Sequence, residues 1–239
     1  MKTLKFTLYL LGMVILFSAC SKDEDPGPAA QSGNKVGLFS GDVRPIAPPE
    51  NMKKSDDPKA IEAVGILEDA NEFRDLDGFF EVPEGATKRS GPVTASNARI
   101  ANTYTVYEWD YGYGSKVIWQ YSDQGDHETF EVFVGSDEDE FIKMYEVIQS
   151  KDGKKGSLDW FGLMRWDWEI RANESYYIDF NYFGGLYSYK IVSNKDLSGS
   201  IEVYSNDSLI SEYSWIASGS GWWKQYDAES GEVTDEGEW

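Results

Sequence analysis

Cysteine and histidine are almost missing from this sequence of 239 residues. Cys20 is the only cysteine, so no disulfide can form within the chain, and in an oxidising compartment its free thiol would be a liability. His127 is the only histidine, which excludes a zinc site built from several imidazoles. We find no nucleophile-elbow, phosphate-loop or dinucleotide motif. The sequence therefore predicts no catalytic residues and no resident metal or other cofactor.

Basic residues are also scarce. The chain has 22 lysines and arginines against 42 aspartates and glutamates, which gives a net charge of −20. Such a field repels phosphate backbones, so we expect no nucleic acid partner. It also opposes docking on anionic lipid headgroups. Attachment to a membrane must then depend on something other than surface charge.

The apolar run at the start of the chain is too short to cross a membrane. It covers Phe6 to Phe17, whereas a spanning helix needs about 20 residues. Two lysines precede it, which is the pattern of a signal peptide. The run ends in Leu16-Phe17-Ser18-Ala19-Cys20, which resembles the lipobox of bacterial lipoproteins, with Phe17 where that family usually has leucine. The resemblance implies that residues 1–19 are cleaved and that Cys20 carries a covalent lipid.

A short acidic stretch follows the cysteine. Lys22, Asp23, Glu24 and Asp25 are similar to the signal that routes surface lipoproteins of the Bacteroidota to the outside of the outer membrane. The alternative is a solvated spacer on a lipoprotein that faces the periplasm. Residues 20–56 are rich in turn-forming residues and lack apolar periodicity, which predicts a disordered tether. The expected localisation is the outer membrane, with the lipid anchor as the membrane contact.

One segment, residues 57–77, has helical periodicity. Pro58 suits the first helical position, and Ile61, Val64 and Leu67 lie in one apolar stripe. From about residue 100 the period changes to two, which predicts strands. Short turns between them predict antiparallel neighbours. We expect one long strand through 158–170 and others at 102–109, 115–122, 128–134, 141–150, 176–182, 187–193, 199–205, 208–216 and 222–226.

The expected fold class is mainly β. Residues 57–239 should form a single domain in which an antiparallel meander makes a curved sheet or a barrel-like half-barrel, with one N-terminal amphipathic helix packed on it. The apolar stripe of the helix should face Trp160, Met164, Trp166 and Trp168, because neither apolar surface has another partner in the sequence.

Acidic groups offer two weaker possibilities. The clusters Asp75–Gly78 and Ser136–Glu140 could hold calcium, although neither has the spacing of an EF-hand loop. A glycosidase needs two carboxylates at a set separation, which Asp159, Asp167, Glu169 and Asp179 could supply. These four acids alternate with the aromatic face of the predicted sheet. That pattern favours a solvated outer face.

Aromatic residues are the more telling feature, since they make up 15% of the chain. Tyr111 and Tyr113 lie in a glycine turn, and the adjacent Trp222 and Trp223 cannot both face inward on a strand. Exposed tyrosine and tryptophan beside acids can stack on sugar rings, and the same rings are common at protein interfaces. We therefore take these four residues as candidates for binding a glycan or a protein ligand.

Two short patterns concern the C-terminal part. Asp207-Ser208-Leu209 matches the Asp-Ser/Thr-aliphatic sequon of O-glycosylation in Bacteroidota, which makes Ser208 a candidate modification site. Residues 221–226, followed by Gly231 and by Gly237-Glu238-Trp239, resemble a MORN-type hairpin repeat. Little more than one copy is present, so the resemblance predicts a hairpin and nothing further.

The sequence thus favours a non-catalytic, lipid-anchored lipoprotein with a β-domain that binds a ligand. One alternative is a carrier of lipophiles with a concave aromatic sheet, and a second is a hydrolase that uses a carboxylate pair. A closed apolar cavity would favour the carrier, an open aromatic shelf the glycan-binding protein, and paired buried carboxylates the enzyme.

Overall fold

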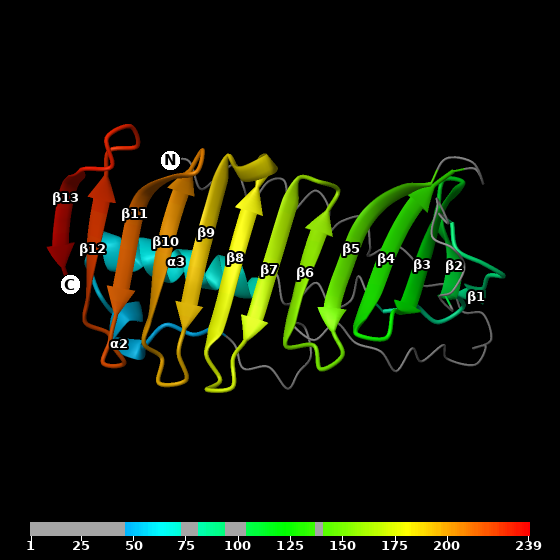
Figure 1. Cartoon of the computed structure of the whole chain (residues 1–239), viewed down its shortest axis with the longest axis horizontal. Helices are drawn as coiled ribbons and strands as arrows, with labels where there is room; N and C mark the ends of the chain where they lie inside the picture. The colour runs from blue at the N-terminus through cyan, green and yellow to red at the C-terminus, as the bar shows by residue number, and fades with distance from the viewer. Residues whose placement is uncertain (1–45, 73–80, 94–103, 137–140) are drawn as a thin grey trace.

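The computed structural model of the protein describes residues 46–72, 81–93, 104–136 and 141–239. Over these ranges it holds one sheet of thirteen strands and two α-helices (Figure 1). The helices are α2 (Glu50–Lys53) and α3 (Pro58–Glu72), with a 3-10 turn η3 at Phe183–Gly185. The strands are β1 (Thr87–Lys88), β2 (Tyr104–Gly112), β3 (Ser115–Asp123), β4 (His127–Gly135), β5 (Ile142–Ser150), β6 (Lys155–Trp160), β7 (Met164–Ile170), β8 (Tyr176–Tyr182), β9 (Tyr187–Ser193), β10 (Gly199–Ser205), β11 (Ser208–Trp215), β12 (Gly221–Tyr226) and β13 (Val233–Glu238).

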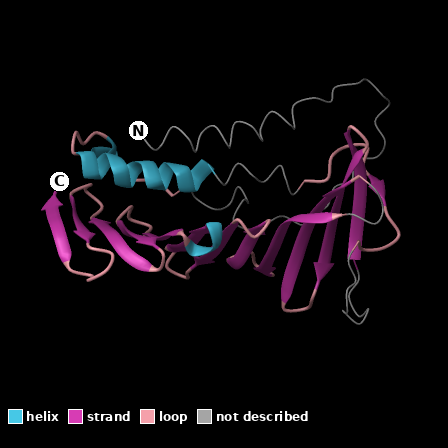
Figure 2. Ribbon diagram, turned by 90° about the horizontal axis from the view of Figure 1, so that it is seen from above, coloured by secondary structure: helices cyan, strands magenta, loops and turns pink. Residues whose placement is uncertain are grey.

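The strands form an antiparallel meander, as the sequence predicts. Their order in the sheet is their order in the chain, from β1 to β13, so the sheet is open and does not close into a barrel. Seen from above, the sheet is curved, and α3 lies along its concave side (Figure 2). The expected fold class is therefore confirmed.

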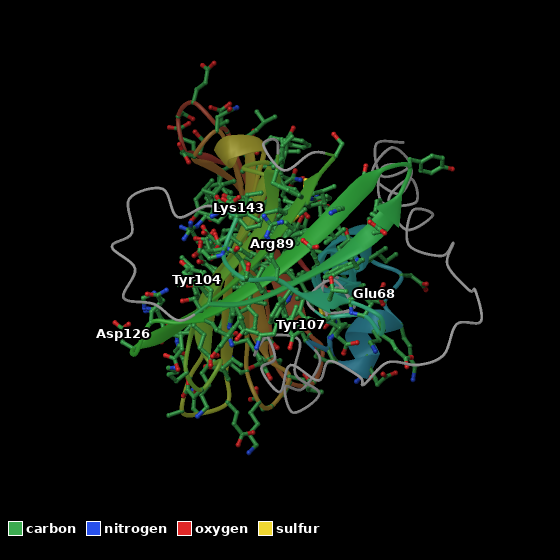
Figure 3. The ribbon with its side chains drawn as sticks, turned by 90° about the vertical axis from the view of Figure 1, so that its right-hand side faces the viewer. Glu68, Arg89, Tyr104, Tyr107, Asp126 and Lys143 are labelled. Atoms are coloured by element: carbon green, nitrogen blue, oxygen red, sulfur yellow. The ribbon has the colours of Figure 1, made fainter. Side chains whose placement is uncertain are left out.

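The two faces of the sheet differ in character. Trp119, Trp166, Ile178 and Tyr213 are buried on the concave face with α3 and form the main core. The convex face has one small apolar cluster near its β2 end, made of Val106, Ile118 and Phe133. Figure 3, viewed from that end, shows Arg89 and Lys143 on the other side of the sheet from Glu68 of α3.

Helix α3 begins with a side-chain cap. Asp57 Oδ1 accepts hydrogen bonds from the backbone N–H groups of Lys59 and Ala60, at 2.7 and 3.3 Å. This satisfies donors that have no partner within the helix. The described helix ends at Glu72, so the expected continuation to residue 77 falls outside the described residues.

The stripe that the helix buries agrees only in part with the one expected: Leu67 is fully buried and Val64 packs against the core at its border. Ala60, Ala63, Leu67 and Ala70 are buried against the sheet, whereas Ile61 is 55% exposed. Ile61 was therefore wrongly placed in the core. Small alanines let the helix backbone approach the large rings of the concave face. The spacing of three and four residues between the alanines therefore indicates the buried side of the helix better than the positions of the larger apolar residues do.

Helix α3 covers only the later strands. Near its start, the Lys59 ammonium lies 5.4 Å from the centre of the Trp223 ring in β12. Near its end, Asp69 is close enough to Tyr189 in β9 that its charge adds to burial in raising the pKa of that phenol. A 15-residue helix is about 22 Å long, which matches about five strands at about 4.8 Å each. Strands β8 to β12 thus lie beneath α3 (Figure 1).

The packed region begins earlier than the expected boundary at residue 57. Ile46 and Met52 are buried, and α2 contacts the turn between β11 and β12. Asn51 Nδ2 donates a hydrogen bond to Ser218 O at 3.0 Å. The tether predicted for residues 20–56 is therefore wrong over 46–56, while residues 20–45 lie outside the described part of the chain.

The single long strand predicted at 158–170 is in fact two strands. Phe161 and Gly162 have φ values of 53° and 66°, and Leu163 N donates to Trp160 O at 2.9 Å, so the chain turns back here. Trp160 is paired with Met164 across the resulting hairpin. Because the loop has three residues, the alternation of faces continues through the turn, and the period of two does not reveal it.

A pairing of tryptophan with glycine recurs along the sheet, and in three of these pairs the indole also donates a hydrogen bond. Trp168, Trp215 and Trp239 each lie against a glycine of the adjacent strand, and each indole Nε1 donates to a backbone carbonyl near that glycine. The glycines are Gly156, Gly199 and Gly221, and the accepting carbonyls are those of Gly153, Leu197 and Gly219. The missing Cβ gives each ring its space, and the hydrogen bond satisfies its one polar atom.

Candidate functional site

The convex face of β8 to β12 carries a row of charged residues. The strand register places them directly opposite one another, so that two lysines flank a pair of glutamates. Cross-strand neighbours on one face are close enough to interact. In order across the strands the row is Asp179, Lys190, Glu202, Glu212 and Lys224.

Tyrosines gather around the two glutamates of this row. Tyr204 Oη donates to Glu202 Oε2 at 2.6 Å, and Tyr226 Oη donates to Glu212 Oε2 at 2.8 Å. The charge of Glu202 also acts on a third ring, that of Tyr177 in β8. We define the Glu202 cluster as Tyr177, Asp179, Lys190, Glu202, Tyr204, Glu212 and Tyr226. All seven side chains are half-buried, which fixes them more firmly than fully exposed ones.

The carboxylates keep the phenols protonated. The hydrogen bond to Glu202, together with burial, raises the pKa of Tyr204 to about 12. Partial burial and the hydrogen bond to Glu212 raise the pKa of Tyr226 to about 12. Burial also raises the pKa of Asp179, although Lys190 opposes this shift. At neutral pH the cluster therefore offers neutral tyrosine rings.

Cations lie over the faces of several rings on this side of the sheet. The Lys190 ammonium is 4.5 Å from the centre of the Tyr204 ring, and the Lys224 ammonium is 5.4 Å from that of Trp222. The Arg171 guanidinium is 5.6 Å from the Tyr177 ring. A ring face that lies under the cation of a surface side chain is not covered by packed core, so a ligand can take the place of that cation.

The four aromatic candidates from the sequence do not form one site. Trp222 and Trp223 do point to opposite faces, because Trp223 packs with the concave core and Trp222 lies under Lys224 on the convex face. Tyr111 packs against the core at the β2 end, and Tyr113 is fully exposed in the turn after it. The two pairs thus lie at opposite ends of the sheet.

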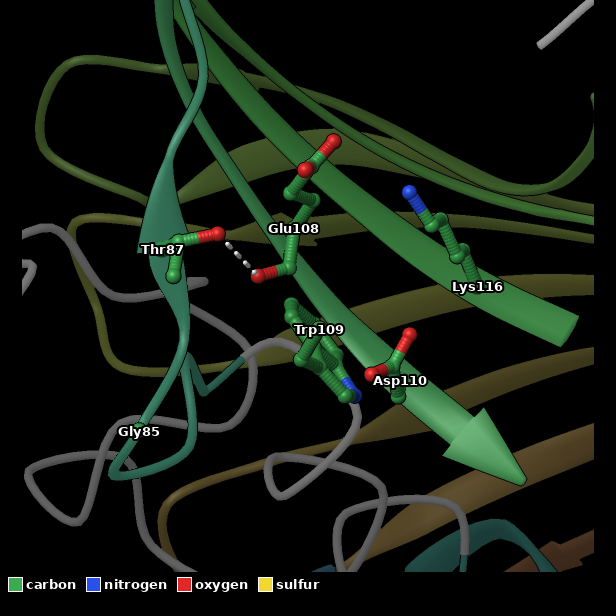
Figure 4. Close-up of a pocket in the computed structure, with 6 residues that line it drawn as sticks. All are labelled: Gly85, Thr87, Glu108, Trp109, Asp110 and Lys116. Atoms are coloured by element: carbon green, nitrogen blue, oxygen red, sulfur yellow. Dashed lines mark hydrogen bonds between the residues drawn. The ribbon is translucent and has the colours of Figure 1, made fainter. Parts of the chain in front are cut away.

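A small pocket lies at the β1 end, away from the Glu202 cluster (Figure 4). Its volume is about 200 Å³ and its lining is mostly polar. Thr87 Oγ1 donates to the backbone carbonyl of Glu108 at 3.3 Å across its wall. The lining residues are Gly85, Thr87, Glu108, Trp109, Asp110 and Lys116. The pocket lining contains none of the residues singled out from the sequence.

Other candidates fall outside the described residues or show no site. Cys20 and Lys22, Asp23, Glu24 and Asp25 are not described, nor are most residues of the two acidic clusters considered for calcium. His127 interacts with Asp126 at 2.5 Å on the surface. Within the described ranges no three metal-binding side chains come together, and no helix is long and apolar enough to span a membrane.

Ser208 begins β11, directly after the turn that joins it to β10. Asn206 and Asp207 have φ values of 49° and 64°, the left-handed values of a two-residue hairpin turn. The sequon thus lies at a hairpin turn as expected. Modification of Ser208 stays a prediction.

The chain matches no family model and no curated protein. The candidate site is therefore argued from its geometry alone. The sequence missed Tyr177, Tyr204 and Tyr226, because only the register of β8 to β12 brings them around Glu202. The one local signal was the spacing of Glu202 and Tyr204, two residues apart and so on the same face.

Proposed function

We propose that this protein is a non-catalytic lipoprotein, anchored in the outer membrane by Cys20 and exposed at the cell surface, which binds a glycan through the Glu202 cluster. The observation that carries the glycan proposal is a set of three tyrosines beside carboxylates on one solvent-facing side of the sheet, two of them hydrogen-bonded to a glutamate. The rigid core beneath α3 supports these strands from the other side.

The chemistry of the Glu202 cluster suits a sugar. Tyrosine rings offer flat apolar faces for the C–H groups of a pyranose, while glutamates accept hydrogen bonds from its hydroxyls. Because Tyr204 and Tyr226 are already bound to carboxylates, little ordering is required when a ligand arrives. A flat shelf of this kind fits an exposed chain of sugars better than a small enclosed molecule.

The charge of the protein restricts the glycan class. The net charge is −20. The row of charged residues continues into Glu236 of β13, so it contains four acids and two lysines. Sulfated or uronate-rich glycans would be repelled by this field. Neutral or amine-bearing sugars are therefore the expected ligands.

Replacing Tyr204 by alanine should weaken glycan binding by about tenfold or more, because a central aromatic contact is worth more than 1 kcal/mol. The ligand would be found on a glycan array and its affinity measured by titration calorimetry. Tyr113→Ala is the matched control, since Tyr113 is fully exposed at the far end of the sheet. Equal affinities for the Tyr204 variant and the wild type, or no neutral glycan bound at all, would contradict the proposal.

Replacing Cys20 by serine should abolish lipid attachment, because a hydroxyl does not replace the thiol in forming the thioether. Cells would be labelled with radioactive palmitate and then fractionated. Ser21→Ala leaves the thiol in place and should keep full incorporation of label. If the Cys20 variant stays labelled and membrane-bound, the anchor lies elsewhere and the lipoprotein assignment is wrong.

One observation bears on the hydrolase alternative, which requires two neighbouring carboxylates. Asp167 of β7 is directly opposite Asp179 of β8. Arg165 donates two hydrogen bonds of 2.8 Å to Asp167, one to each carboxylate oxygen, which favours a structural role for this carboxylate. The carrier alternative calls for a closed apolar cavity, and the described pocket has a polar lining. We therefore prefer the binding protein to both.

A further inference from the structure

The sheet presents one full-length free edge in the described part of the chain. Strand β13, Val233–Glu238, has β12 as its single neighbour, whereas the opposite edge strand β1 has two residues. Five of the six β13 residues are exposed, and only Gly237 is half-buried. An edge strand of this kind offers unpaired backbone groups to another extended chain.

The register shows which backbone groups point outward. Trp239 and Gly221 exchange two backbone hydrogen bonds, of 3.0 and 3.3 Å. Such pairs alternate with pairs whose backbone groups point away from the partner strand. Glu238 lies opposite Trp222 and Glu236 opposite Lys224, so both glutamates direct their N–H and C=O groups away from β12. The Glu236 N–H donates to Asp235 Oδ1 at 3.0 Å, a local bond that a partner strand would replace.

The side chains of this edge decide which chain could pair with it. Glu236 and Glu238 lie on the convex face, where Glu236 is 4.0 Å from the Lys224 ammonium. Asp235 is paired with Gln225 of β12 and lies on the concave face. A second copy of β13 would place acids opposite acids, which destabilises a strand pair. An uncharged strand would gain no electrostatic attraction. A strand with lysine or arginine at alternate positions would place positive charge beside both glutamates.

We infer that the free edge of β13 binds an extended, basic segment of a partner protein, which adds to the sheet as a further strand. Backbone hydrogen bonds to Glu236 and Glu238 hold the segment, and alternate lysines or arginines face the two carboxylates. The edge lies beyond the Glu202 cluster, so a partner could bind here while the convex face is free for a glycan.

The test uses the full protein and a short synthetic peptide of alternating lysine and threonine. Binding should be measurable by calorimetry, and the amides of Glu236 and Glu238 should become protected from hydrogen exchange when the peptide is present. A peptide of equal charge with a methyl group on every backbone nitrogen cannot donate these hydrogen bonds. Its affinity should be at least about tenfold weaker.

Variants at Glu236 separate the contribution of the backbone hydrogen bond from that of the side-chain charge. Glu236→Pro removes an outward N–H without removing a bond to β12, so it should lose about tenfold in affinity for the lysine–threonine peptide. Glu236→Gln keeps the N–H and should lose less, with a weaker dependence on salt. If the N-methylated peptide binds as tightly as the unmodified peptide, or if neither amide gains protection, the contact is only electrostatic and the inference is overturned.

Discussion

Replacing Leu67 by aspartate is expected to unfold the domain or to lower its melting temperature sharply. Leu67 is fully buried between α3 and the aromatic concave face. A carboxylate there would lose its water without gaining a partner, at a cost of several kcal/mol. A domain of this size has a stability of about 5–15 kcal/mol, so the loss is a large fraction of the total. Thermal unfolding followed by circular dichroism would measure it.

Ile61→Asp is the matched control on the same helix. Ile61 is 55% exposed, so its replacement removes little apolar contact and leaves the new carboxylate in water. We expect a change within about 0.5 kcal/mol. Similar melting temperatures for the Leu67 variant and the wild type would show that α3 does not belong to the core.

A single added methyl group at Gly199 should also destabilise the protein. A Cβ at this position would collide with the backbone carbonyl of Val192 and would lie 2.6 Å from Cζ2 of Trp215. A strand carbonyl cannot move aside without breaking the sheet, and the Trp215 ring is held by its hydrogen bond to Leu197 O. Overpacking of this kind costs about 1–3 kcal/mol, or several degrees in melting temperature.

Gly65→Ala tests the same change where space is available. Nothing lies within 4 Å of a Cβ at Gly65, which is in the middle of α3. Alanine favours the helix by about 0.5–1 kcal/mol over glycine, so this variant should melt at a higher temperature than the wild type. The two alanine variants thus have opposite expected signs. A stable Gly199→Ala protein would contradict the tryptophan–glycine packing described above.

Much of the fold could be predicted because alternation of apolar and polar residues follows directly from a half-buried strand. The alternation failed at Phe161 and Gly162, where a three-residue turn preserves its parity. It also failed for β13, whose exposed acidic residues have no apolar face to signal a strand. The MORN-like pattern of residues 221–239 nevertheless predicted a hairpin, and β12 and β13 form it.

The candidate site was less accessible from the sequence. Glu202 and Tyr204 are two residues apart, but Tyr177 and Tyr226 reach them only through the pairing of β8 to β12. Register depends on turn geometry and bulges, such as the shift between Val203 and Tyr204, which residue patterns do not show. The four aromatic candidates from the sequence, Tyr111, Tyr113, Trp222 and Trp223, lie at the two ends of the sheet, and none of them belongs to the Glu202 cluster.

The sequential order of the strands has a consequence for how this architecture can change in length. A closed barrel fixes its number of strands, because losing one hairpin breaks the ring. Here each strand pairs only with strands adjacent in the chain, so a hairpin can be inserted or deleted and the flanking strands can still pair. The strands beneath α3 are the exception, since the fixed length of that helix determines how many of them it can cover. Related chains would then differ in steps of one hairpin, mostly outside β8 to β12.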